Sequence, residues 1–206
     1  MRPVVSWPAK NSSPMSNTLF PVFLRLDRLN TLVVGGGNVA LEKVSALLRN
    51  SPEARVTMVA PFYREELLEY LADFPLVERL ERKFEFGDLE DRDVVICATD
   101  DRDLHVQIKL RASEKHLLCN VADTPDLCDF YLGSIVQKGD LKIAISTNGK
   151  SPTLAKRIRA FLEDVIPDEI QAGLEGMEEA RKTLKGDFQE KIRVLNELTK
   201  DFIFRK

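Results

Sequence analysis

The feature that most constrains the fold of this 206-residue chain is a glycine-rich turn set between a β-branched run and a helical pattern. The run covers residues 31–34, and the glycines occupy 35–37. Apolar side chains then recur on one helical face, at Ala40, Val44, Leu47 and Leu48. A second apolar run at 56–60 completes the pattern of a βαβ unit, so we expect an α/β fold with a parallel sheet.

The glycines match a dinucleotide-binding fingerprint, Gly35-x-Gly37-x-x-Ala40, with alanine at its third position. Gly35 would allow the tight turn, and Gly37 would let a pyrophosphate approach the backbone. Ala40 would allow the helix and strand to pack closely. The pyrophosphate would then lie against free N–H groups at the positive end of the helix.

The second strand ends without the acid that usually bonds a ribose hydroxyl, since the chain reads Val59-Ala60-Pro61-Phe62 there. Backbone groups at Pro61 and Phe62 can take that role, with the Phe62 ring against the ribose or adenine. Arg64 is either a receptor for the 2′-phosphate of NADP or a solvated residue of the next helix. The second interpretation is favoured, so NAD is the predicted cofactor and NADP stays open.

The rest of the sheet is predicted from the residues that follow. We expect a helix over 63–73, strand-like pieces around 76–77 and 83–86, and a buried strand over 93–98. Thr99 follows that strand, at the end where open α/β sheets bind ligands, and is a candidate cofactor contact. Asp100 and Asp101 are best explained as caps of the next helix.

The last strand, over 117–121, delivers Asp123 to the same edge of the sheet. A carboxylate there would lie next to the nicotinamide and act as a proton acceptor. The plainer alternative is a turn-forming aspartate ahead of Pro125. Position alone favours neither interpretation.

An antiparallel hairpin is expected next, with strands over 134–137 and 141–146 around the Lys138-Gly139-Asp140 turn. A hairpin at the end of a parallel sheet offers a free edge to a partner, and a homodimer is therefore predicted. Two amphipathic helices should close the chain, with packing faces at Ile170, Leu174, Met177 and Leu184, and at Phe188, Ile192, Leu195 and Phe202.

A helix start is predicted between the hairpin and those helices, with Ser151 as N-cap and Pro152 as first helical residue. Positive charges gather around it, at Lys150, Lys156, Arg157 and Arg159. Such a helix start is a suitable receptor for a polyanion. The alternative is a solvated basic face.

Composition excludes several classes of protein. With 30 basic and 33 acidic side chains, the net charge of −3 argues against a dedicated nucleic-acid binder. No uncharged stretch approaches the roughly 18–20 apolar residues of a membrane span, so we expect a soluble protein. Residues 1–14 contain three prolines and lack the apolar centre of a signal peptide, and they are expected to be a disordered extension.

Cysteine and histidine usage argues against disulfides and metal. Cys97, Cys119 and Cys128 lack metal-ligand spacing, and the chain has two histidines. Cys97 and Cys119 are expected to be buried, whereas Cys128 lies in a polar stretch where a reactive thiol is the less favoured alternative. No metal site is predicted, and a reducing cytoplasm is the expected compartment.

Five ordered motifs together resemble the precorrin-2 dehydrogenase family, which occurs as a stand-alone enzyme or as the N-terminal part of siroheme synthases. The motifs are Leu19–Leu24, Val33–Ala40, Ala98–Asp101, Cys119–Asp123 and Ile143–Pro152. The resemblance is close over residues 16–165. It implies a Rossmann-type NAD-binding domain (15–123), a β-hairpin dimerisation segment (124–150) and a small C-terminal helical domain (151–206).

The resemblance also implies a reaction, the oxidation of precorrin-2 to sirohydrochlorin with NAD⁺. Some members then insert Fe²⁺, a substrate, to give siroheme. Asp123 matches the family's key aspartate, and NAD contacts are implied at Asn38, Val39, Pro61 and Phe62. The carboxylate-rich tetrapyrrole would bind at a set of residues after the hairpin, which are Ser146, Thr147, Lys150, Ser151 and Arg157. Thr147 stands where some relatives carry a second serine.

Two alternatives remain open at this point. A non-catalytic dinucleotide-sensing module would share the glycine turn and the dimer, but it would need neither Asp123 nor the anion site at 147–152. An enzyme that keeps only the chelatase reaction would tolerate a degraded glycine turn, yet the turn in this chain is intact.

Overall fold

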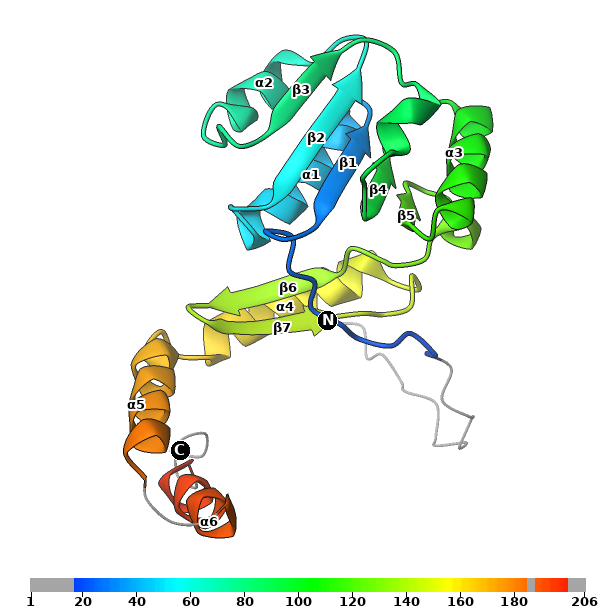
Figure 1. Cartoon of the computed structure of the whole chain (residues 1–206). Coiled ribbons are helices and arrows are strands. Elements are labelled where there is room, and N and C mark those ends of the chain that lie inside the picture. The colour runs from blue at the N-terminus through cyan, green and yellow to red at the C-terminus, as the bar shows by residue number, and fades with distance from the viewer. Residues whose placement is uncertain (1–16, 185–187, 200–206) are drawn as a thin grey trace, which may run out of the picture.

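The computed structural model describes residues 17–184 and 188–199 and has a five-stranded parallel sheet at its centre (Figure 1). The strand order is β3-β2-β1-β4-β5. In register, Val33 of β1 lies opposite Met58 of β2, and Val34 lies opposite Cys97 of β4. The strands are β1 (Asn30–Val34), β2 (Arg55–Ala60), β3 (Glu78–Glu81), β4 (Val94–Cys97) and β5 (Leu118–Val121).

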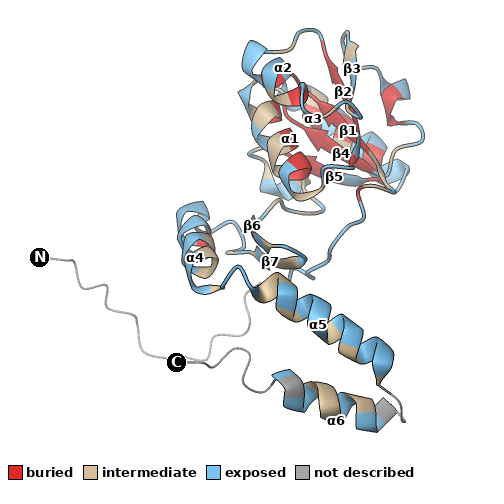
Figure 2. Ribbon diagram, turned by 90° about the vertical axis from the view of Figure 1, so that its left-hand side faces the viewer, coloured by how far each residue is buried: buried red, intermediate tan, exposed pale blue. Residues whose placement is uncertain are grey.

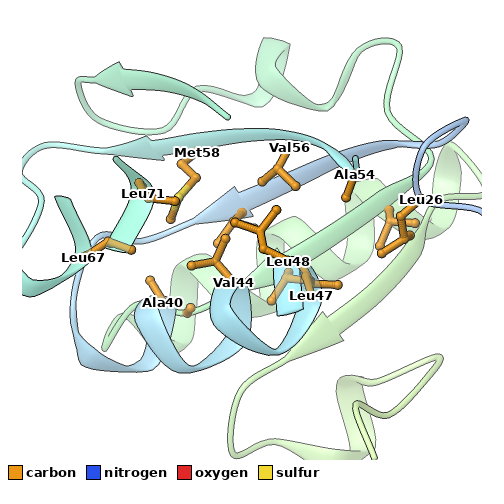
Figure 3. Close-up of a cluster of buried hydrophobic side chains, with 14 residues drawn as sticks. Leu26, Ala40, Val44, Leu47, Leu48, Ala54, Val56, Met58, Leu67 and Leu71 are labelled. Atoms are coloured by element: carbon orange, nitrogen blue, oxygen red, sulfur yellow. The ribbon is translucent and has the colours of Figure 1, made fainter. Parts of the chain in front are cut away.

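Helices cover both faces of this sheet, as the near-continuous apolar strands predicted. The helices are α1 (Asn38–Asn50), α2 (Glu65–Leu71) and α3 (Arg102–Glu114). Val44 of α1 and Leu67 of α2 pack with Val33 and Met58 on one face (Figure 3). Ile108 of α3 packs on the other face, with the buried Cys97 and Cys119 among its neighbours. The predicted α/β architecture is confirmed.

The strand-like pieces predicted around 76–77 and 83–86 are wrong. Strand β3 lies between them, and the second piece leads into a 3₁₀ turn, η1 (Phe86–Leu89). Asp88 explains the turn, because its carboxylate accepts hydrogen bonds from the Arg82 guanidinium at 2.5 and 2.9 Å and from the Glu85 N–H at 2.9 Å. Local side-chain bonds of this kind compete with strand pairing.

A second layer lies below the sheet in both views (Figures 1 and 2). The predicted hairpin forms from β6 (Ser134–Lys138) and β7 (Leu141–Ile145), and α4 (Pro152–Val165) packs on it through the buried Ala155. Lys142 of β7 donates a hydrogen bond to the Asn50 carbonyl at the end of α1. Because α1 runs back from the glycine turn, the hairpin lies beneath the amino ends of the strands.

The two closing helices are confirmed as α5 (Ile170–Thr183) and α6 (Phe188–Thr199). Figure 2 shows them exposed or half-buried, and α5 has no buried side chain, so its predicted stripe is only partly packed. Gln171 ties α5 to the hairpin by accepting from the Asp140 N–H at 2.8 Å. Phe202 lies outside the described residues.

The N-terminal segment contributes little to the core. Residues 17–24 are exposed and belong to no helix or strand, and Leu26 is the first buried side chain along the described chain. The predicted extension over 1–14 lies outside the described residues. Over the described part of the chain, none of the helices has the length and apolar character needed to cross a membrane.

Candidate functional site

The candidate site lies where the strand order reverses, between β1 and β4. The connection from β1 leads outward to β2, while β4 lies on the other side of β1. Connections that leave in opposite directions open a crevice at the carboxyl ends of two such strands. The glycine turn follows β1 at this place, and Thr99 follows β4.

Each of the three glycines meets a different environment. Gly35 has φ +130°, and a Cβ there would lie 2.4 Å from the Ala98 carbonyl oxygen. A Cβ on Gly36 would lie 2.1 Å from the Phe62 carbonyl oxygen. A Cβ on Gly37 would meet no atom within 4 Å, so the space over this residue is open. Gly35 and Gly36 thus serve the packing of the turn, while Gly37 leaves room for a ligand.

Helix α1 begins at this open space. Gly37 is its N-cap and has no side chain to bond the N–H groups of the first turn, which carries no acid. Asn38 is exposed and Val39 is half-buried. Unbonded N–H groups at the positive end of a helix attract an anion, so the turn fits a pyrophosphate.

The loop after β2 closes one side of the crevice. The Arg64 N–H donates to the Gly36 carbonyl at 2.9 Å, which holds this loop against the glycine turn. Pro61 and Phe62 belong to this loop and lie on the surface, where the Phe62 side chain is 63% exposed. An exposed ring beside the glycine turn is available to stack on a nucleotide. The Arg64 guanidinium lies 3.6 Å from the carboxylate of Glu66.

Thr99 is fixed from below by a buried histidine. The Thr99 hydroxyl lies 2.9 Å from Nε2 of His105 and accepts a hydrogen bond from the Asp101 N–H at 3.2 Å. Burial lowers the pKa of His105, which favours the neutral ring at neutral pH. Asp101 also caps α3 by accepting from the Leu104 N–H at 2.9 Å, as predicted.

Asp123 lies at the end of β5, one strand beyond Thr99. The Ala122 N–H donates to the Cys97 carbonyl at 3.0 Å, so this turn continues the edge formed by β4. Asp123 is exposed and has φ +56°, in the left-handed region that most side chains avoid. The turn predicted at this residue is therefore present, while its role as a proton acceptor stays a prediction.

The predicted substrate residues lie elsewhere in the chain. Ser146, Thr147 and Lys150 follow β7, in the layer below the amino ends of the strands (Figure 1). Ser151 caps α4 by accepting from the Leu154 N–H at 3.1 Å, as predicted, and Arg157 is exposed on the same helix. The edge of the sheet thus gathers the predicted cofactor residues with Asp123, but one chain does not bring the second group to them.

Among the basic residues of α4, one is paired. Arg159 lies 3.0 Å from Glu163, one helical turn on. Lys156 and Arg157 are exposed, as is Lys150. The charge of Arg159 is therefore offset by Glu163, whereas Lys150, Lys156 and Arg157 retain the predicted positive character.

Three residues near the edge were missed from the sequence or given no role there. Gly36 falls at a free position of the fingerprint, although the Phe62 carbonyl requires it. His105 and Cys128 support Thr99 and the Asp123 turn from inside. His105 lies on the buried face of α3 at the spacing of Ile108 and Ala112, which could have indicated an inward-pointing ring.

The structure also has a cavity apart from this site, and its described residues form no metal-binding group. A hollow of about 780 Å³ lies at the opposite, amino ends of the strands, where Arg55, Glu78 and Arg92 are among its lining residues. Within residues 17–184 and 188–199, no group of three or more histidine, cysteine or acidic side chains is arranged to hold a metal ion.

The fold, the switch point and the open glycine turn define a dinucleotide-binding protein of the Rossmann type. A family described as "Putative NAD(P)-binding" matches residues 22–134, and one described as "Sirohaem biosynthesis protein central" matches residues 138–164. The chain belongs to this NAD(P)-binding family, in the form that is joined to the sirohaem central segment.

Similar proteins carry related names. A siroheme synthase of Thioalkalivibrio sulfidiphilus is 45% identical over 148 residues, which are 72% of this chain and 30% of that protein. One of Pseudoalteromonas atlantica is 38% identical over 169 residues, covering 82% of this chain and 36% of that protein. The chain thus spans about a third of these relatives. A solved structure, "SirC, precorrin-2 dehydrogenase", matches with a TM-score of 0.71 and 26% identity, covering 90% of this chain and 92% of that one.

Proposed function

We propose that this chain is a cytoplasmic dehydrogenase that oxidises precorrin-2 to sirohydrochlorin with NAD⁺. The observation that supports the proposal is that the open space over Gly37 and the exposed carboxylate of Asp123 both follow strands of one parallel sheet at their carboxyl ends. The names of the similar siroheme synthases and of SirC support the choice of substrate. We propose with it that the chain is divided into an NAD-binding domain up to residue 123, a dimerisation segment up to residue 150 and a helical domain after it.

Residues after β1, β2 and β4 bind different parts of the cofactor. Gly35 shapes the turn, and the N–H groups at Asn38 and Val39 bind the pyrophosphate. Pro61 and Phe62 hold the adenosine part, and Thr99 meets the nicotinamide side. Bound NAD⁺ supplies the hydride acceptor.

Asp123 accepts the proton that leaves the macrocycle with the hydride. Precorrin-2 and NAD⁺ thereby give sirohydrochlorin, NADH and one proton, which balances atoms and charge. An exposed carboxylate at the end of β5 can reach a large substrate lying over the edge of the sheet.

Binding of the substrate requires basic residues, which we propose are supplied by a homodimer. Asp100 follows β4, the strand beside β5, and adds a second acid to the edge, whereas Lys150 precedes α4 and Arg157 lies on it, in the lower layer of the same chain. A polycarboxylate would be repelled by the edge alone. A second copy that brings its Ser146, Thr147 and Ser151 loop and these cations to the edge would neutralise the substrate.

The surface of the lower layer supports such a dimer. Exposed apolar side chains follow one face of α4 at helical spacing, and they are Leu154, Ile158, Phe161 and Val165. An unpaired apolar stripe of this kind marks a contact with another surface. Mixing inactive Asp123→Ala chains with inactive Arg157→Ala chains would restore turnover if each site takes residues from both copies.

The test of the main proposal follows the absorbance of precorrin-2 under anaerobic conditions after NAD⁺ is added. We expect the spectrum of sirohydrochlorin to develop together with NADH, and Asp123→Ala to stop this while NAD⁺ still binds. Turnover that survives Asp123→Ala would refute the role of this carboxylate. Binding of NAD⁺ without any oxidation by the wild-type chain would favour a sensing module instead.

Iron insertion is tested in the same cuvette by adding Fe²⁺ after oxidation is complete. Asp123 is the residue we propose to take pyrrole protons as the metal enters. An ion that is a substrate passes through and needs no resident site. The absence of a siroheme spectrum would confine the chain to the dehydrogenase step.

Cofactor choice is the finer part of the proposal. The carboxylate of Glu66 lies beside the Arg64 guanidinium and partly neutralises its charge, so the guanidinium would add little binding energy for the 2′-phosphate of NADP⁺. We expect NAD⁺ to bind more tightly than NADP⁺ in calorimetric titrations. Glu66→Gln, which removes the negative charge beside the guanidinium, should reduce the difference in Kd between NAD⁺ and NADP⁺. An unchanged ratio of the two Kd values would exclude a role of Arg64 in the choice of cofactor.

A further inference from the structure

A thiol fills the inside of the turn that carries Asp123. The 3₁₀ turn η2 (Pro125–Leu127) packs against β5, so that Cys128, which follows it, contacts Val121 at the end of that strand. Its Sγ accepts a hydrogen bond from the Val121 N–H at 3.2 Å. The same sulfur lies 3.2 Å from the Val121 carbonyl and 3.4 Å from the Thr124 carbonyl, which share its single proton.

Neighbouring contacts hold this thiol in place. Asn120 Nδ2 approaches the sulfur at 3.5 Å and donates to the Phe130 carbonyl at 2.8 Å. The carboxylate of Asp129 accepts from the Cys119 N–H at 2.9 Å and lies 2.5 Å from Lys109 Nζ of α3. The segment after η2 is therefore fastened both to β5 and to the helix behind it.

The turn needs such support because its backbone is unfavourable. A direct bond closes it, from the Thr124 N–H to the Val121 carbonyl at 3.3 Å, which is long for a hydrogen bond between amide groups. Asp123 occupies the left-handed region within this turn, a conformation that persists only when the surrounding structure enforces it. The exposed carboxylate itself has little around it to fix its direction.

We propose that Cys128 is a positioning residue for Asp123, holding the backbone of Val121 and Thr124 so that the carboxylate faces the edge of the sheet. The inference rests on the proposed role of Asp123. Burial raises the pKa of the Cys128 thiol, so it remains a neutral S–H donor at neutral pH. This protonation state fits a structural donor and opposes the reactive thiolate considered from the sequence.

The first test measures the turn itself and is independent of turnover. In Cys128→Ala, the amides of Val121 and Thr124 should exchange with deuterium about tenfold faster or more, because local opening becomes easier. The control is Cys119→Ala, which removes a buried sulfur from the cluster under α3. This control should lower the melting temperature but leave exchange in the turn unchanged. Unchanged exchange in Cys128→Ala would overturn the proposal.

The second test separates positioning from stability through the kinetics. We expect kcat of Cys128→Ala to fall about 10–100-fold, the usual effect of a small misplacement of a reacting group. The Kd for NAD⁺ should stay within about twofold, because the glycine turn is untouched. Cys128→Ser keeps a donor and an acceptor and should recover most of the loss, while Cys128→Val, which fills the space without a donor, replaces the alanine variant if that chain fails to fold.

A double-mutant cycle with Asp123→Ala completes the design. If Cys128 acts through Asp123, its replacement should cause no further loss in the Asp123→Ala background. Losses that multiply would overturn the proposal. A wild-type chain that does not oxidise precorrin-2 would contradict the proposed function, while the exchange experiment would still decide whether the thiol holds the turn.

Discussion

Replacing Gly37 by alanine should separate cofactor binding from folding. A Cβ at this position meets no atom within 4 Å, and φ is −94°, which alanine adopts readily. Alanine is a poorer N-cap than glycine by roughly 0.5–1 kcal/mol. The lower entropy of the unfolded chain returns about 0.4–1 kcal/mol, so the free energy of unfolding should change by about 0.5 kcal/mol or less.

Binding should respond much more strongly than stability. The added methyl group would occupy the space in which the pyrophosphate meets the backbone. We expect the Kd for NAD⁺ to rise about 10–100-fold, or roughly 1.4–2.8 kcal/mol. Isothermal titration calorimetry would measure the Kd, and thermal unfolding without nucleotide would measure the stability.

Gly35→Ala provides the matched control with the opposite behaviour. Its Cβ would lie 2.4 Å from the Ala98 carbonyl at φ +130°, and the neighbouring atom is backbone that cannot turn away. Strain and overpacking together should cost about 4 kcal/mol. At about 2–4 °C per kcal/mol, the melting temperature should fall by roughly 10 °C. An NAD⁺ affinity of Gly37→Ala equal to wild type, or a Gly35→Ala chain that melts with wild type, would refute this reasoning.

Three further changes test the described contacts. The hydrogen bond from the Arg82 guanidinium lowers the pKa of Asp88. This pair therefore stabilises the fold at pH values above the ordinary pKa of aspartate, and the stabilisation is lost as the pH falls through the lowered pKa. Asp88→Asn should lower the free energy of unfolding by about 1–2 kcal/mol at pH 7 and make it depend less on pH on the acid side, as measured by denaturant titrations. Asp101→Ala removes the cap of α3 and should cost about 1 kcal/mol, seen as a lower melting temperature. Asp123→Gly should be more stable than Asp123→Ala by about 1–2 kcal/mol, because alanine resists the left-handed backbone, while both variants lose turnover.

Each of these expectations has a definite contrary result. An Asp88→Asn curve that follows wild type down to acidic pH would show that the pair contributes no pH-dependent stability. Equal melting temperatures for Asp101→Ala and wild type would mean that the Leu104 N–H finds another acceptor. Equal stabilities of the glycine and alanine variants at position 123 would show that the backbone there is not held in the left-handed region.

Periodicity predicted the fold well where burial was the main force. Residues 31–34, 56–60 and 93–98 are largely apolar, as suits strands covered by helices on both faces, and all three ranges formed strands. The prediction failed at 76–86, where polar side chains decide the structure. Asp88 bonds the Glu85 N–H and the Arg82 guanidinium, and the apolar Phe84 and Phe86 give no sign of either contact.

The candidate site was predictable to the extent that it follows from topology. Gly35 and Thr99 had to meet once β1 and β4 were neighbours, and a Cβ on Gly35 would indeed strike Ala98, next to Thr99. The conformation of Asp123 and the path of the chain after it could not be predicted. They depend on η2 turning back under β5, and thus on hydrogen bonds between residues close in sequence but not periodic.

A left-handed backbone alone does not mark a functional residue in this chain. Within the described ranges, Asp91, His116 and Asn148 also have positive φ. His116 follows directly on the end of α3, a place where such angles are ordinary. Asp123 differs because its carboxylate follows β5 at the carboxyl ends of the parallel strands, and a thiol bonds the turn on both sides of it. A turn that served folding alone would be satisfied by glycine at this position. The contacts with Cys128 therefore hold an acid in a conformation that glycine adopts more readily, and the proposed role of Asp123 gives a reason for an acid at this position.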